Sequence, residues 1–590
     1  MMVGAMLRLF TQHYIRPVES LDGVWQFITA DERSAASGLP RKYTRSLYVP
    51  SAWESTPGFE NYRGTAWLKT TFDTGGRANV RLVFGGVSHT GTVYIDGEEY
   101  GTHYDAFTPW SVVVPALNAG HHELIVRVDN SFGDHSALHL ENDYYTYGGI
   151  TRPVELQIIP DVFIDAVFAT PVHTKEGWNL EIVLRVTNCG ADDAEPEMHL
   201  RVAGREYNAG ATKVKAGTTT LCECVIGSLD VEPWSADTPQ LYPLNCMLLQ
   251  DGMLTDDLSE RIGFREVRVQ GRKLLLNGEE LRLQGFNRHE DHPQFGNALP
   301  VEAMVRDLEL MRDLGANFVR TCHYPNDMRF LDLCDQVGMY VWEESHARAV
   351  KFDHPMYKEQ ITASTIEMVD WHYNHPAIII WGCLNECESI TASGKREHAR
   401  VLRLLKEMDG TRPVTFASMY ADRDLCLGEV DIVSWNRYDA WYGGAVDQIE
   451  PKIKDILRWL HSDKSHGGKG KPVIMSEFGA GAIYGNRQVC TSKWSEEYQS
   501  DVLDESLRVY LDEPDIIGTA IWQFCDVRIT PNWAWSGRPR TMNNKGVVDE
   551  YRRPKLAYEV VKRRMAAREK GQKPKVKGQG SKVKGRKSAR

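Results

Sequence analysis

Residues from 272 onward most strongly constrain the fold, because apolar strands there alternate with helical stretches. The pattern predicts strands at 281–287 and 317–321, with an amphipathic helix at 301–314 between them. Further strands are predicted at 339–344, 378–382, 414–418, 432–435, 473–476 and 517–523. Eight strands separated by helices within about 290 residues are typical of a (β/α)8 barrel. A doubly wound sheet is the alternative, but no Gly-rich phosphate-binding loop follows an early strand, so we favour the barrel.

Two strand-rich parts precede this barrel. Residues 1–160 carry short alternating strands separated by Gly, Asp and Asn, which predicts a jelly-roll-like β-sandwich. Residues 161–270 continue with strands, and their length of about 100 residues suits an immunoglobulin-like β-sandwich. We therefore expect a multidomain β plus α/β protein, with two β-sandwiches followed by a (β/α)8 TIM barrel at 271–565.

A basic tail is predicted at 566–590. Its last twenty residues contain eight Lys or Arg and no acid, and almost nothing apolar that could be buried. Such a composition predicts disorder. The tail could bind polyanions or act as a targeting signal, or it could simply be solvated.

The composition of the whole chain excludes several classes of protein. A net charge of -11 and a pI near 6.0 argue against nucleic-acid binding by the body of the protein. No apolar run approaches the roughly 18 residues of a membrane span, and we do not interpret the N-terminus, with Arg8 inside it, as a signal peptide. The 11 Cys show neither CxxC pairs nor zinc-ligand spacing. We therefore expect no membrane association and a cytoplasmic location.

Two glutamates end predicted barrel strands. Asn385 and Glu386 follow the fourth strand, and Glu477 ends the seventh. Active sites of barrel enzymes lie at the carboxyl ends of the strands. A single Glu at such a position is more often a surface or ion-paired residue, but two of them in one barrel favour catalysis.

Paired carboxyl groups are what the cleavage of a glycosidic bond requires. One protonates the leaving oxygen, and the other attacks or stabilises the anomeric carbon; at a separation of about 5–5.5 Å the configuration is retained. Asn385 could donate to the sugar 2-hydroxyl. As the acid, Glu386 would need a raised pKa, which the charge of Glu477 would supply.

The motifs around these residues resemble those of family 2 glycoside hydrolases. They are Asn385-Glu386, Ser476-Glu477-Phe478-Gly479 and the run Gly-Phe-Asn-Arg-His-Glu-Asp at 285–291. The likeness spans nearly the whole chain, and stretches at 320–325, 436–442 and 494–499 are most similar to the β-glucuronidases within that family.

That resemblance implies two sandwiches and a barrel, with homo-oligomeric assembly. It also implies roles for individual residues: Glu386 as acid/base, Glu477 as nucleophile with Tyr438 beside it, and Asp143, His323 and Trp522 in the sugar pocket.

The resemblance also implies a site for a sugar carboxylate. Asn543 and Lys545 fit the Asn-x-Lys pair with which glucuronidases hold the C6 carboxylate. Arg538 and Arg540 depart from the family pattern by placing positive charge beside this pair, and we expect Arg540 to bind substrate. An ammonium and an amide are suitable donors for a carboxylate. Because most lysines are exposed, Lys545 could instead lie in a surface turn.

Several departures from the glucuronidase pattern leave alternatives open. His346 and Arg348 could reach the pocket or brace Glu344, and residues 287–293 resemble the galactosidase branch. The short link at 345–357 predicts an open entrance. Glu290 and Asp291 do not show the spacing of a cation site, so we expect no metal and no cofactor.

The overall prediction is a retaining exo-β-glucuronidase acting on a small-molecule or oligosaccharide uronide. A β-galacturonidase or dual β-hexuronidase is the first alternative, since the two sugars differ only at C4. A β-galactosidase and a carbohydrate-binding protein that has lost activity are weaker ones.

Overall fold

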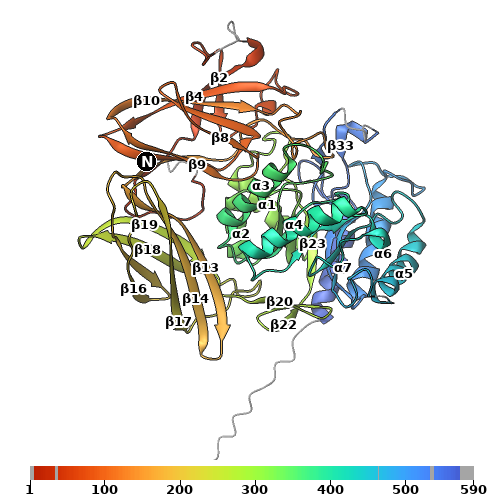
Figure 1. Cartoon of the computed structure of the whole chain (residues 1–590). Helices are drawn as coiled ribbons and strands as arrows, with labels where there is room; N and C mark the ends of the chain where they lie inside the picture. Colours follow the sequence, from red (N-terminus) through yellow and green to blue (C-terminus); the bar gives the residue numbers. More distant parts are fainter. Residues whose placement is uncertain (1–5, 33–37, 463, 532–536, 572–590) are drawn as a thin grey trace, which may run out of the picture.

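The structure is a computed structural model and describes residues 6–32, 38–462, 464–531 and 537–571. Figure 1 shows a first sandwich (orange), a second (yellow), and a barrel of strands and helices (green to blue) beside both. The predicted multidomain β plus α/β fold is confirmed. Residues 566–571 continue the last helix, α7 (Ala557–Gly571), and the rest of the predicted basic tail, 572–590, lies outside the described residues.

The first sandwich packs a four-stranded sheet, in the order β1-β12-β5-β9, against a six-stranded sheet, in the order β3-β2-β4-β10-β7-β8. Its core includes Trp25, Phe27, Leu82 and Phe84, all 0 or 1% exposed. The strands are β1 (Val18–Ser20), β2 (Gly23–Thr29), β3 (Arg45–Val49), β4 (Thr65–Thr74), β5 (Ala78–Phe84), β7 (Thr90–Ile95), β8 (Glu98–Tyr104), β9 (Trp110–Leu117), β10 (Gly120–Asp129) and β12 (Val154–Ile159), with the short pair β6 (Val87–Ser88) and β11 (Gly149–Ile150).

The second sandwich packs the sheet β13-β14-β17 against the sheet β16-β15-β18-β19. Side chains of β14 (Gly177–Asn188) alternate between buried and partly exposed, as expected for a strand with one face on a core. The other strands are β13 (Val162–Thr174), β15 (Glu197–Val202), β16 (Arg205–Ala211), β17 (Thr219–Leu229), β18 (Tyr242–Gln250) and β19 (Met253–Ile262).

The barrel is a ring of parallel strand segments in the order β27-β26-β25-β24-β23-β31-β30-β29-β28. The segments β27 (Val414–Thr415) and β28 (Ala417–Ser418) are separated only by Phe416, so they act as one strand between β26 and β29. The others are β23 (Leu283–Asn287), β24 (Phe318–Thr321), β25 (Tyr340–Glu344), β26 (Ile378–Gly382), β29 (Val433–Asn436), β30 (Val473–Phe478) and β31 (Ile516–Ile521). These bounds agree closely with the predicted strands. A small sheet, β20 (Val267–Gln270), β21 (Lys273–Leu276) and β22 (Glu279–Leu281), precedes the ring.

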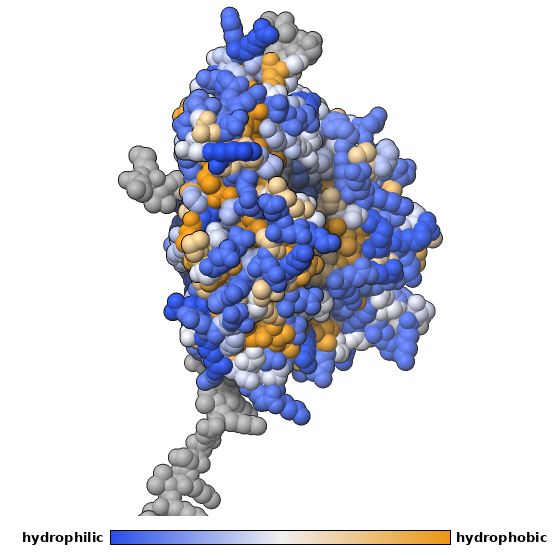
Figure 2. Space-filling view, turned by 60° about the vertical axis from the view of Figure 1, so that its left-hand side comes forward, coloured by the Kyte–Doolittle hydropathy of each residue, from blue (hydrophilic) through white to orange (hydrophobic). Residues whose placement is uncertain are grey.

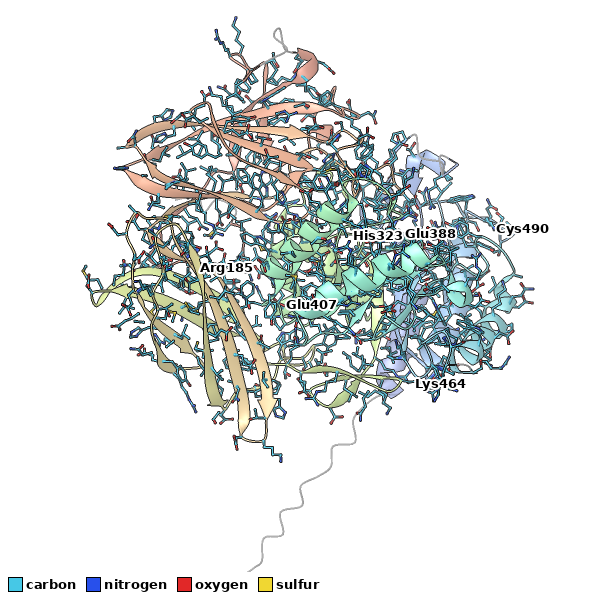
Figure 3. All side chains as sticks on the ribbon, viewed as in Figure 1. Arg185, His323, Glu388, Glu407, Lys464 and Cys490 are labelled. Carbon is cyan, nitrogen blue, oxygen red and sulfur yellow. The ribbon has the colours of Figure 1, made fainter. Side chains whose placement is uncertain are left out.

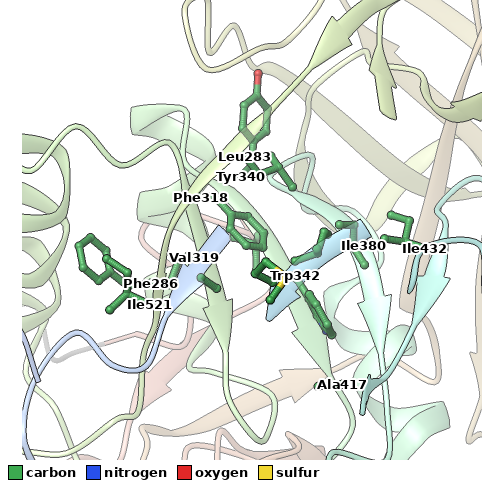
Figure 4. Packing of buried hydrophobic residues seen from close by; sticks show 14 of the residues in the cluster. Leu283, Phe286, Phe318, Val319, Tyr340, Trp342, Ile380, Ala417, Ile432 and Ile521 are labelled. Carbon is green, nitrogen blue, oxygen red and sulfur yellow. The ribbon is translucent and has the colours of Figure 1, made fainter. Parts of the chain in front are cut away.

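Buried strands and amphipathic helices together form the core of the barrel. Figure 4 shows apolar side chains from neighbouring strands, among them Phe318, Trp342 and Ile380, packed in the interior. Helix α2 illustrates the local signals: Asp327 caps its first turn, and Gly338 ends it at φ 74, a left-handed conformation that favours glycine. The helices are α1 (Val301–Asp313), α2 (Met328–Val337), α3 (Tyr357–His372), α4 (Ala392–Met408), α5 (Ile449–Ser462), α6 (Glu496–Asp512) and α7.

Buried ion pairs join the three parts. Arg8, near the N-terminus, binds Glu260 of the second sandwich at 3.0 Å and Asp332 of the barrel at 2.8 Å. Arg152 of the first sandwich binds Glu290 of the barrel at 2.9 Å. Breaking a buried pair leaves an uncompensated charge, so these contacts fix how the parts are placed.

The outer surface is mostly hydrophilic. Figure 2 shows one face, on which hydrophobic residues gather only in small, separate groups. Within the described residues, the helices are either too short or too polar to cross a bilayer.

Candidate active site

Glu386 and Glu477 line the same cavity, at the carboxyl ends of the barrel strands. Glu386 lies four residues beyond the end of β26, and Glu477 is the fifth residue of β30. The cavity has a volume of about 570 Å³. Figure 3 labels His323, another lining residue, where the barrel meets the first sandwich. Tertiary structure thus brings together the two carboxyl groups that the strand ends predicted.

Both oxygens of Glu477 accept a hydrogen bond. Arg320 donates to Oε1 at 2.9 Å, and the hydroxyl of Tyr438 donates to Oε2 at 2.7 Å. Arg320, the third residue of β24, is itself buried, and it also donates to Glu344 at 2.8 Å. These contacts orient Glu477 as an attacking carboxylate would need to be oriented.

Glu386 is held by a different pair of donors. Asn436 donates to Oε1 and Arg348 donates to Oε2, each at 3.1 Å. The backbone of Glu386 adopts φ 52, in the left-handed region that non-glycine residues rarely occupy. Such strain gathers at functional sites, where the surrounding structure maintains it.

The two carboxyl groups influence each other's protonation. Burial raises the pKa of Glu477 to about 7; the charge of Glu386 adds to this rise, and Arg320 opposes it. Glu477 shares Arg320 with Glu344, so this cation offsets the rise only in part. The sequence predicted the same repulsion with Glu386 as the group whose pKa is raised, and that assignment stays a prediction.

Asn385 lies beside Glu386 but is not among the residues that line the cavity. Its Oδ1 accepts from Arg320 at 2.8 Å and from Asn436 at 3.2 Å. Its Nδ2 is buried and has no hydrogen-bond partner among the described residues. A buried amide without a partner is costly, so this N–H group suits a sugar hydroxyl such as the predicted 2-hydroxyl.

Four residues predicted by resemblance also line the cavity: Asp143, His323, Tyr438 and Trp522. The rings of His323 and Trp522 stack, with centroids 5.1 Å apart. Asp143 lies in the first sandwich, which therefore contributes directly to the wall of a barrel cavity.

Asn543 and Lys545 lie just behind the residues that line the cavity. Asn543 donates to Oδ2 of Asp143 at 3.0 Å. Lys545 is only 1% exposed, so the surface alternative is wrong, and its Nζ lies 5.5 Å from the ring of Tyr438. Burial, together with the positive charge of Arg538, lowers the pKa of Lys545 to about 7. Its Nζ also lies 5.7 Å from the ring of Trp441 and 5.4 Å from that of Tyr442.

The two arginines before this pair point in different directions. Arg538 lines the cavity and forms an ion pair with Asp143. Arg540, in contrast, pairs with Glu550, and its side chain is 46% exposed. The prediction that Arg540 contacts substrate is therefore not supported by its position, because a left-handed backbone at Arg540 (φ 63) turns the chain there.

The residues that follow β25, the third barrel strand, also differ in whether they reach the cavity. Arg348 reaches the cavity, where it binds Glu386 and also Oδ1 of Asn142 at 2.7 Å. His346 points away from the cavity, and its Nε2 lies 3.1 Å from the hydroxyl of Tyr144. Glu344 is instead bound by Arg320 and by His323 at 3.1 Å. The alternative in which His346 or Arg348 braces Glu344 is thus wrong.

Sequence reasoning missed three residues that organise the site: Arg320, Glu344 and Asn436. Like the two catalytic candidates, each stands at the carboxyl end of a barrel strand. Applying the same criterion to every polar strand end would have found them. Their roles as partners of Glu477 and Glu386 depend on neighbours that are remote in the sequence.

Comparison with known proteins agrees with this geometry. Residues 267–569 match the family model for the TIM barrel domain of glycosyl hydrolases family 2, and residues 162–265 match a second model of that family. The chain belongs to glycosyl hydrolase family 2. It is therefore an enzyme that hydrolyses glycosidic bonds.

Similar proteins within family 2 carry hexuronidase names. A β-galacturonidase from Eisenbergiella tayi, solved with galacturonate bound, is 42% identical, with 95% of this chain and 99% of that chain covered and a TM-score of 0.89. The β-glucuronidase of Bacteroides uniformis is 29% identical, with 93% and 69% covered and a TM-score of 0.83. The β-glucuronidase of Streptococcus agalactiae serotype V is 25% identical, with 93% and 96% covered.

Proposed function

We propose that this family 2 enzyme is a retaining exo-β-hexuronidase. The observation that carries this proposal is the buried ammonium group of Lys545 beside a cavity that holds two carboxyl groups. Arg348 and Arg538, which line the cavity, are already paired with Glu386 and Asp143. A neutral sugar would gain nothing from a buried ammonium that bears a desolvation cost, whereas a C6 carboxylate would be attracted to it.

The contacts support a two-step reaction. Glu477 attacks the anomeric carbon while Glu386 gives its proton to the leaving oxygen, which forms a glycosyl-enzyme and releases the aglycone. Glu386 then removes a proton from water as the water attacks the anomeric carbon, which releases the uronic acid and regenerates Glu477. Arg320 and Tyr438 keep Glu477 directed at the sugar, and Asn385 donates to the 2-hydroxyl.

Among the hexuronides, we propose β-D-galacturonides as preferred substrates and β-D-glucuronides as the second candidate. The sequence motifs favoured glucuronides, and many of the similar proteins are named β-glucuronidases. The galacturonidase from Eisenbergiella tayi is nevertheless more similar to this chain, at 42% sequence identity against 29% for the β-glucuronidase of Bacteroides uniformis. The two sugars differ only at C4 and present the same carboxylate. The higher overall sequence identity to the galacturonidase therefore favours the galacturonide.

A panel of p-nitrophenyl β-glycosides tests these proposals. We expect kcat/KM to be highest for the galacturonide, lower for the glucuronide and at least about 100-fold lower for the galactoside, which corresponds to the loss of one good charge contact. A galactoside cleaved as well as the uronides would refute hexuronide specificity, and a preferred glucuronide would refute the epimer preference alone. Proton NMR of the first product formed should show the β-anomer if configuration is retained.

We propose two further properties, one of assembly and one of location. Leu221 and Val225 are each more than 60% exposed on β17, an edge strand, and we propose that contacts of this kind support a homo-oligomer. We also propose a cytoplasmic location, because the cysteine pattern suits a reducing compartment. Light scattering on the purified protein and fractionation of the source cells would test the two proposals separately.

A further inference from the structure

Three buried side chains from distant parts of the sequence meet behind the active-site cavity. Asp105 follows strand β8 of the first sandwich, His139 lies in the loop after β10, and His346 follows β25 of the barrel. Each is at most 1% exposed. One possible ligand atom of each lies within 4.8 Å of those of the other two.

The distances within this Asp–His–His cluster suit a shared metal ion. Oδ1 of Asp105 is 3.3 Å from Nε2 of His139 and 3.7 Å from Nδ1 of His346. The longer separation exceeds that of a hydrogen bond. In a tetrahedral zinc site with bonds of about 2.0–2.1 Å, neighbouring ligand atoms lie about 3.3 Å apart. The two distances from Asp105 are thus compatible with three ligands of one ion, and the third separation is within 4.8 Å.

Buried polar atoms of the cluster lack a hydrogen-bond partner among the described residues, as expected for a site that binds a cation. Oδ2 of Asp105 and Nδ1 of His346 are buried without a hydrogen-bond partner among the described residues. A buried carboxylate oxygen without a partner is expensive, and a cation would satisfy it. Asp105 also adopts φ 130, a strained conformation for a residue with a side chain. Strain of this kind persists where the surrounding structure serves a function.

Each histidine ring of the cluster has one further polar contact. The Nε2 of His346 faces the hydroxyl of Tyr144 at 3.1 Å, and metal-binding imidazoles commonly donate from their second nitrogen to such an oxygen. Nε2 of His139 lies 3.2 Å from the amide of Ala106, a contact that a bound ion would replace.

We propose that Asp105, His139 and His346 form a structural binding site for a zinc-class divalent ion. Two imidazole nitrogens with one carboxylate favour zinc over the harder calcium and magnesium ions. Water or the second oxygen of Asp105 completes the coordination. The ion joins the first sandwich to the barrel, and it fixes the loops that carry Asp143 and Arg348 into the cavity.

Metal analysis of the full-length protein tests this site. Purified protein incubated with Zn²⁺ and then dialysed should retain about one zinc ion per chain, and removal of zinc with a chelator should lower Tm until Zn²⁺ is restored. Apoprotein titrated with Co²⁺ should develop the intense visible absorption of a tetrahedral site. The variants Asp105→Asn and His346→Gln should lose both signals.

The second buried carboxylate–histidine cluster provides a matched control. In the cluster of Asp332, Asp335 and His375, every carboxylate oxygen has a hydrogen-bond partner, for example Arg8 at 2.8 Å and the amide of Ala377 at 2.9 Å. In Asp105 only Oδ1 has one, the amide of Phe107 at 3.1 Å, and Oδ2 has none among the described residues. His375→Gln should therefore keep the zinc content of the wild type. The proposal would be overturned if the wild-type protein retained no zinc or showed no Co²⁺ spectrum. It would also be overturned if Asp105→Asn retained as much zinc as the wild type. If the variants fail to fold, the Co²⁺ titration of the wild type decides the question.

Discussion

Arg320 joins Glu477 to Glu344 with a single guanidinium group. Its Nη1 donates to Glu477 at 2.9 Å, while its Nη2 donates to Glu344 at 2.8 Å. The planar fork of an arginine holds two carboxylates in fixed directions, which the point charge of a lysine cannot do. The position of the proposed nucleophile therefore depends on a residue that is 157 positions away in the sequence.

Replacing Arg320 by Lys should lower kcat about 100-fold, as expected when an oriented charge contact in the site is lost. Because Arg320 opposes the rise in the pKa of Glu477, the acid limb of kcat/KM should also move to higher pH. Arg185→Lys is the control, since Arg185 forms partly exposed pairs with Asp165 and Asp370 away from the cavity. An unchanged pH profile in Arg320→Lys would contradict the positioning role.

Replacing Glu477 by Gln should reduce kcat by about 10⁴-fold or more, which is the scale for removal of an essential catalytic group. Circular dichroism and Tm should remain close to those of the wild type, because Gln keeps the size of the side chain. Glu388→Gln serves as the control: Glu388 is exposed two residues after Glu386, and its replacement should leave activity unchanged. Substantial turnover by Glu477→Gln would rule out its role as nucleophile.

Replacing Lys545 by Met should lower kcat/KM for uronides by about 100-fold while changing that for the neutral galactoside little, since one charge contact is worth about two pKa units. Arg540→Ala should leave both rates unchanged, because Arg540 pairs with Glu550 outside the cavity. Rates on both substrates for both variants check this prediction. Equal losses on the uronide and the galactoside would contradict carboxylate recognition by Lys545.

The ratio of kcat/KM for a uronide to kcat/KM for the galactoside should fall as pH rises through about 7. Lys545 has its pKa lowered to about 7, so it is a cation below this pH and neutral above it. The glutamate pair titrates identically for both substrates and cancels in the ratio. Measurements from pH 5 to 9 check the prediction, and in Lys545→Met the ratio should not vary with pH.

An open entrance should let the enzyme accept oligosaccharide ends about as well as small aryl uronides. Only twelve residues, 345–356, link β25 to α3, and Met419 and Tyr442 at the cavity are 48% and 55% exposed. Initial rates on aryl uronides and on uronide-terminated oligosaccharides test this. A strong preference for the aryl substrates would indicate that the entrance is restricted.

The sequence alone determined the order of the three parts and the two catalytic candidates. Period-two and helical patterns are local, so strands such as β26 were predicted to the residue. Barrel topology then places the carboxyl ends of all strands on one face, so the sequence alone predicts that Glu386 and Glu477 lie in one site.

Tertiary structure alone decided the partners of these residues. Strand-end position does not reveal that Arg348 binds Glu386, that Lys545 is buried or that Arg540 turns outward. The Asp–His–His cluster unites residues 105, 139 and 346, whose spacing resembles no metal motif. The physical reason is the range of the interactions: secondary structure follows from neighbours along the chain, whereas burial, ion pairing and pKa shifts depend on groups that only the folded chain brings together.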